Sequence, residues 1–172
     1  MATSPVAHAW RLALFEADWS IKGPLSRRRQ DRAPAIFAGL EASVPFPKRL
    51  GSPPEFGSLV LELARSGADL AGVVSFHGGL STSMPAAPGA VKASVLVLNG
   101  ADDKGTAGDI AGFEKEMNAA GVDWQFVNFG GAVHCFALPH ANQPGCAYNE
   151  RAAKRSERIM RGFLAERFAA GR

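Results

Sequence analysis

The sequence predicts an α/β fold built around a mostly parallel sheet, and two observations support this prediction. From residue 57 onward, short apolar runs alternate with segments of helical periodicity, which is typical of βαβ units. Asp103 and His134 each follow one of these runs at a short distance. In an open parallel sheet the crevice outside the carboxyl ends of the strands is where chemistry is placed, so we expect the two side chains to lie near each other.

The predicted helices follow from apolar spacing and from their end signals. The segment at residues 58–66 has apolar residues four apart and ends before Gly67, a typical helix stop. A second helix is predicted at residues 106–120, opened by a Thr-x-x-Asp cap formed by Thr106 and Asp109. A third runs from the capping residue Asn149 to about residue 169.

Three apolar runs predict the strands of the sheet. Residues 70–76 and 94–98 are almost continuously apolar, as expected for strands covered on both faces. Residues 122–129 alternate in polarity, which favours a position nearer the edge of the sheet.

The N-terminal segment, residues 1–55, has a different character from the α/β part at residues 56–172. Residues 10–19 have the spacing of a short amphipathic helix, and no strand is predicted with clear periodicity. Residues 1–50 carry eight Lys/Arg against four Asp/Glu, mainly through Arg27, Arg28 and Arg29. Because aromatics and a binding motif are missing from this cluster, we interpret it as a solvated segment and expect no nucleic acid partner.

Composition also bears on localisation and cofactors. No stretch approaches the roughly 18 apolar residues of a membrane span, so we expect no membrane partner. Residues 1–20 lack the pattern of a secretory signal, and two cysteines are too few for a disulfide framework, which together predict a cytoplasmic protein. Cys135, His140 and Cys146, with His134, lack the Cys-x-x-Cys spacing of a zinc site, and we expect no metal and no cofactor.

Five stretches in order carry a resemblance to a known family. They are Phe-Gly-Ser-Leu-Val-Leu-Glu-Leu-Ala-Arg-Ser-Gly at 56–67, Gly-Val-Val-Ser-Phe-His-Gly-Gly-Leu at 72–80, Val-Leu-Val-Leu-Asn-Gly-Ala-Asp-Asp at 95–103, Gly-Ala-Val-His-Cys-Phe at 131–136, and Ala-Tyr-Asn-Glu at 147–150. Together they closely resemble the C-terminal half of the dienelactone hydrolase family. The resemblance implies a partial α/β-hydrolase fold whose N-terminal half is missing or replaced.

The resemblance also implies an activity and its residues. Family members hydrolyse carboxylic esters or lactones through a nucleophile–Asp–His triad, so the implied partner is a small-molecule ester or lactone. Asp103 matches the family's acid and His134 its histidine. In such a triad the histidine takes the proton from the nucleophile and returns it to the leaving group, while the aspartate fixes its tautomer.

The nucleophile is where this chain departs from the family. The family's cysteine stands in Gly-Tyr-Cys-Phe-Gly-Gly, and alignment places Pro54 or Glu55 at that position. No Gly-x-Ser-x-Gly motif occurs in the chain. Ser52 and Ser58 lie nearby, but Ser58 is better interpreted as a helix cap or first-turn residue. Residues 77–79, His-Gly-Gly, imitate an oxyanion-hole motif, and a tight turn is the simpler interpretation.

Three interpretations therefore remain open. The chain is a hydrolase whose nucleophile is not found, a catalytically inactive remnant or interaction module of the same fold, or the product of a frame-shifted or truncated gene. A further expectation concerns the strand at residues 70–76, which has no lysine or proline to blunt an edge. If the N-terminal part, for example residues 35–44, supplies no neighbouring strand, we expect self-association through this exposed edge.

Overall fold

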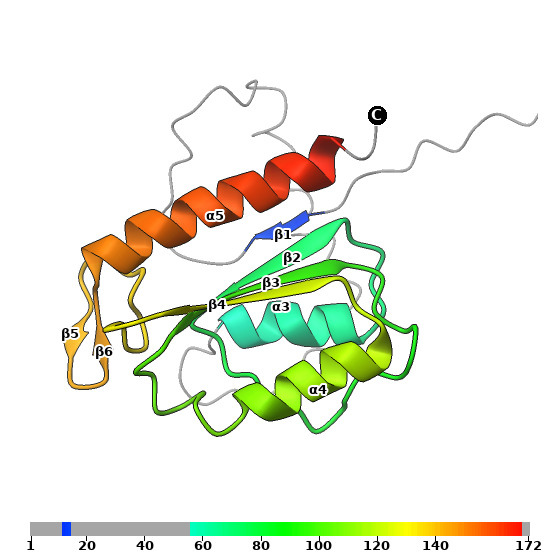
Figure 1. The fold of residues 1–172 in the computed structure, drawn as a ribbon, viewed down its shortest axis with the longest axis horizontal. Helices are drawn as coiled ribbons and strands as arrows, with labels where there is room; N and C mark the ends of the chain where they lie inside the picture. The colour runs from blue at the N-terminus through cyan, green and yellow to red at the C-terminus, as the bar shows by residue number, and fades with distance from the viewer. Residues whose placement is uncertain (1–11, 15–55, 170–172) are drawn as a thin grey trace, which may run out of the picture. The chain divides into compact units, whose positions relative to one another are not determined.

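A four-stranded parallel sheet forms the centre of the protein in the computed structural model, which describes residues 12–14 and 56–169 (Figure 1). The strands are β1 (Leu12–Leu14), β2 (Gly72–Phe76), β3 (Ser94–Gly100) and β4 (Trp124–Phe129), in that spatial order. Each pair of neighbours is parallel. The α/β class predicted from the sequence is confirmed.

Strands β2 and β3 are buried along their whole length. Five residue pairs join them, from Gly72 opposite Ser94 to Phe76 opposite Leu98. Their continuous apolar sequence is explained because helices cover both faces of the sheet at this point. Strand β4 is half-buried or exposed except at Phe129, which is buried, and it has a single neighbour, β3, within the described sheet.

Strand β1 corrects the prediction made for the N-terminal segment. The amphipathic helix expected at residues 10–19 is wrong at Leu12–Leu14, which pair in parallel with residues 72–74 of β2. Local helical spacing is a weak preference, and pairing with a buried strand overrides it here. Residues 35–44, considered only as a possible source of a strand beside residues 70–76, lie outside the described residues, as does the rest of residues 15–55.

Three helices enclose the sheet in two layers, as Figure 1 shows: α3 (Phe56–Arg65) and α4 (Ile110–Ala120) lie on one face and α5 (Glu150–Ala169) on the other. The first layer packs Val60, Leu61 and Phe113 against Val73 and Val95. The second layer joins α5 to the opposite face of the sheet. Its buried members include Val74, Phe76, Leu96, Leu98 and Met160.

The observed helix ends show which sequence signals correctly predicted where a helix begins or stops. Helix α3 stops before Gly67, whose φ of 77° is readily adopted by glycine, and Asn149 caps α5 by accepting a 3.1 Å hydrogen bond from the amide of Ala152. The cap predicted for α4 at Thr106 is wrong, because this helix begins only at Ile110. The Thr106 hydroxyl instead donates to the side-chain oxygen of Asn99, at 3.0 Å.

The start of α3 lies directly against the end of β2, and two glycines permit the contact. A Cβ on Gly57 would stand 2.6 Å from the carbonyl oxygen of Phe76, and one on Gly78 would stand 2.4 Å from the carbonyl carbon of Gly57. The hydroxyl of Ser58 accepts a 2.8 Å hydrogen bond from the amide of Gly79. Ser58 is therefore a residue of the first turn of α3, as the sequence predicted.

A short antiparallel hairpin precedes α5, formed by β5 (Asn142–Gln143) and β6 (Cys146–Ala147). Within the described part of the chain, no helix has the length and apolar character needed to cross a membrane.

Candidate active site

Asp103 is held in a turn that follows β3. Its amide donates to the carbonyl of Gly100 at 3.1 Å, and its side-chain Oδ1 accepts from the amide of Gly105 at 2.8 Å. The residue is only 5% exposed. One carboxylate oxygen is therefore fixed by the backbone, which orients the other oxygen, Oδ2.

The segment that carries His134 crosses the end of β3 at very short range. A Cβ on Gly100 would lie 2.5 Å from the carbonyl oxygen of Ala132 and 2.7 Å from that of Val133. The same carbonyl of Ala132 accepts from the amide of Asp102 at 2.9 Å. Glycine is required at position 100 because any side chain would push the His134 segment away from the turn that holds Asp103.

These two segments bring Asp103 and His134 together, as expected from their places after successive strands. Nδ1 of His134 lies 2.9 Å from Oδ2 of Asp103. The aspartate side chain is 5% exposed and the histidine side chain 24% exposed. A carboxylate on Nδ1 fixes the ring's orientation and leaves proton transfer to Nε2, which is the arrangement of an acid–histidine pair in a hydrolytic triad.

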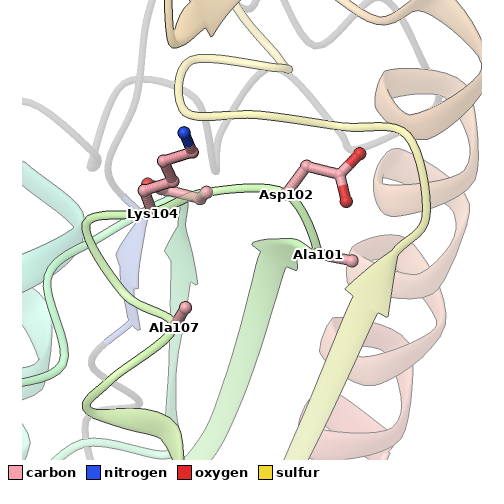
Figure 2. A pocket seen from close by; sticks show the side chains of 5 residues that line it. Ala101, Asp102, Lys104 and Ala107 are labelled. Carbon is pink, nitrogen blue, oxygen red and sulfur yellow. The ribbon is translucent and has the colours of Figure 1, made fainter.

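The pair opens on a cavity of about 460 Å³ whose lining includes Asp103, His134, Val133, Gly145 and Cys146. A second hollow of about 330 Å³ lies over the turn after β3. Figure 2 shows this hollow, with the side chains of Asp102 and Lys104 pointing in different directions from the turn. Of the two side chains, that of Asp103 is buried and that of His134 is partly exposed.

A disulfide next to His134 was not anticipated from the sequence. Cys135 and Cys146 are bonded, with their Cα atoms 4.9 Å apart, although the sequence was interpreted as having too few cysteines for a disulfide framework. The bond joins the residue after His134 to β6, and the amide of Ala147 donates to the carbonyl of His134 at 3.0 Å. A count of two cysteines carries no information on pairing, because pairing depends on the fold that brings them together.

His77 is a second histidine close to the pair, and sequence reasoning assigned it only to a tight turn. Its ring centroid lies 5.0 Å from that of His134. Burial lowers the pKa of His77 to about 4, and the neighbouring His134 adds to this lowering.

The other candidates do not join the site in the described residues. Ser52, Pro54 and Glu55, the positions considered for a nucleophile, lie outside them. Among residues 12–14 and 56–169, no group of three or more metal-ligating side chains could hold an ion, and the two cysteines considered as zinc ligands are bonded to each other.

Comparisons with a family model and with solved structures point to the same family. A family model for the dienelactone hydrolase family matches residues 56–168. A solved structure of a protein named m3DLH has a TM-score of 0.62 and 35% sequence identity, covering 80% of this chain and 63% of its own. The dienelactone hydrolase-like promiscuous phosphotriesterase P91 from metagenomic libraries has a TM-score of 0.62 and 33% identity, covering 81% and 65%.

A third structure, a putative dienelactone hydrolase from Klebsiella pneumoniae, is 21% identical with a TM-score of 0.54 and supports the fold alone. It covers 63% of this chain and 48% of its own. No curated protein matches the sequence. The chain spans less than two thirds of the length of each of these solved proteins. The family match over residues 56–168 and the shared sheet with its flanking helices show that the chain belongs to the dienelactone hydrolase family.

Proposed function

We propose that this chain carries the acid–base half of a hydrolase for carboxylic esters or lactones, with His134 as the proton-transfer residue and Asp103 as its orienting acid. The observation that supports the proposal is the 2.9 Å contact between Nδ1 of His134 and Oδ2 of Asp103 beside an open cavity. Family membership supports a hydrolase-type activity. In the proposed role His134 activates the attacking group and later protonates the leaving group.

We further propose that the chain by itself turns over esters very slowly, because neither proline nor glutamate at positions 54 and 55 offers the family's thiol nucleophile. Removing the nucleophile from a complete triad lowers kcat by about 10⁶-fold. What remains is general-base catalysis of water attack by the histidine. The alternative, a non-catalytic module, is supported by the same absence of a nucleophile at Pro54 and Glu55. The measurement below separates the slow hydrolase from the non-catalytic module.

The test is hydrolysis of a p-nitrophenyl ester by the purified chain, with His134→Ala and Asp103→Asn as variants. We expect a small residual rate that both substitutions reduce. His140→Ala is the matched control, because His140 is an exposed histidine outside the cavity lining beside the pair and its loss should leave the rate unchanged.

Two results would contradict the proposal in different ways. Equal rates for the wild type, His134→Ala and Asp103→Asn would remove the acid–base role and favour the non-catalytic module. Turnover comparable to that of an intact member of the dienelactone hydrolase family, abolished by His134→Ala, would show that the chain possesses its own nucleophile.

A further inference from the structure

His77 has a backbone conformation that the strand before it does not explain. It follows the last residue of β2, and its amide still donates to the carbonyl of Leu98 at 2.9 Å. Its φ is 38°, in the left-handed region that non-glycine residues rarely adopt. Side chains alternate along a strand, so a regular continuation would send His77 to the same face as Ser75. The positive φ ends that alternation.

The consequence of this conformation is a contact with the candidate active site. The His77 ring meets the ring of His134 at 5.0 Å between centroids with an interplanar angle of 67°. It also meets Phe136 at 5.6 Å and 85°. Both are edge-to-face arrangements, the geometry in which aromatic pairs attract each other. His77 therefore contacts both the core residue Phe136 and the reactive histidine.

The chemical identity of His77 carries a cost that a purely apolar ring would avoid. The residue is 5% exposed, and its buried Nε2 has no hydrogen-bond partner. An unpaired buried polar atom is destabilising, and such atoms in native structures call for an explanation. The pKa of His77, lowered by burial and by His134, keeps this ring neutral at pH 7. A neutral ring does not repel the positive charge that His134 acquires during proton transfer.

We propose that His77 is a positioning residue for His134: its ring forms a wall that holds the His134 imidazole in the orientation that bonds Asp103. The inference rests on the proposed function, because that function requires the His134 ring to keep this orientation. The test of the positioning role does not depend on turnover. The left-handed backbone at position 77 places the ring beside His134, and the fully buried Phe136 contacts the His77 ring edge to face.

The test is the exchange rate of the His134 Nδ1–H proton, measured by NMR on protein labelled with ¹⁵N histidine. This proton is protected while it is bonded to Asp103, and the Asp103→Asn variant identifies its resonance. His77→Gly removes the ring, and glycine adopts a positive φ without strain. We expect the His134 proton to exchange about three- to tenfold faster in this variant, as loss of one aromatic contact permits.

His77→Phe is the matched variant, because it keeps the ring and removes the unpaired nitrogen. We expect it to retain slow exchange. Should His77→Gly fail to fold, His77→Asn takes its place, since asparagine also tolerates a left-handed backbone. Unchanged exchange in the ringless variant would overturn the proposal, as would fast exchange in a folded His77→Phe protein.

The outcome is distinguishable from failure of the proposed function. A protein with no residual esterase rate but with ring-dependent protection of the His134 proton would keep the positioning role and lose the catalytic one. Residual hydrolysis together with protection of the His134 proton that does not depend on the His77 ring would keep the catalytic role and lose the positioning role.

Discussion

At the scale of single residues, His134 and His77 lie close together but have different environments. His134 is partly exposed, bonded to a carboxylate and open to the cavity. His77 is buried, with an unpaired Nε2 and a pKa lowered to about 4. Groups in one site whose environments differ in this way can take different roles in proton transfer, and in the proposed function His134 is the histidine that carries the proton.

The lowered pKa of His77 predicts a specific pH dependence of stability. The unfolded chain binds a proton at this residue near pH 6.5, whereas the folded chain does so only near pH 4. Below pH 6.5 the unfolded state therefore binds more protons, so the free energy of unfolding falls as pH drops, and this component amounts to about 3 kcal/mol by pH 4. His77→Phe should remove it.

The measurement is urea denaturation of the wild type and His77→Phe at several pH values between 7 and 4. The variant should show a shallower decline, because its carboxylates titrate as in the wild type. His140→Asn, at an exposed position, should decline as steeply as the wild type does. Parallel curves for the wild type and His77→Phe would show that His77 titrates normally in the folded protein.

At the scale of elements, the segment between β4 and α5 depends on two close contacts. Gly100 lets it pass over the end of β3, and the disulfide joins Cys135 to β6. The second contact closes a loop with a sequence separation of 11. Restricting an unfolded chain in a loop of this length contributes about 3 kcal/mol to stability.

We therefore expect a reductant to lower the free energy of unfolding of the wild type by about that amount. The Cys135→Ala/Cys146→Ala double variant should be insensitive to the reductant and should match the reduced wild type. Urea denaturation with and without dithiothreitol measures both. Two alkylatable thiols in the protein purified without reductant, detected by intact mass, would contradict the prediction.

The sequence predicted the elements that are long and periodic, and it missed those that depend on distant contacts. Helices α3 and α5 were identified because they have apolar residues at helical spacing, and strands β2 and β3 because they are almost continuously apolar. Strand β1 has only three residues and acquires its identity from β2. The expected Thr106 cap failed for a similar reason, since the hydroxyl bonds to Asn99, seven residues earlier in the chain.

In the candidate site, too, some features were predicted from the sequence and others depend on contacts between distant segments. Asp103 and His134 were identified from their places after strands and from the family resemblance, and the structure brings them to 2.9 Å. The disulfide and the contact between His77 and His134 have no local signal in the sequence, because each joins segments that only the folded sheet brings together.

At the scale of the whole molecule, the question is what protects the apolar edge of β2. In the described residues β1 pairs with residues 72–74 of β2, while Ser75 and Phe76 extend beyond this ladder. The pairing is short, and a buried strand without lysine or proline becomes a site of association once its neighbour leaves. We propose that self-association of this chain is controlled by the β1–β2 ladder.

Substitution of Ala13 by proline tests this proposal, because proline removes a backbone donor and restricts β1 at the centre of its three residues. We expect Ala13→Pro to shift the protein toward dimers or soluble aggregates, measured by light scattering after size-exclusion chromatography over about a tenfold concentration range, as β-edge pairing would require. Met84 is the most exposed of the large hydrophobic side chains among the described residues, at 69% exposure, and offers another route to association. The Ala13→Pro/Met84→Ser protein is therefore the control, and it should associate as strongly as Ala13→Pro alone. A monomeric Ala13→Pro protein, or association abolished by Met84→Ser, would show that the β2 edge does not control assembly.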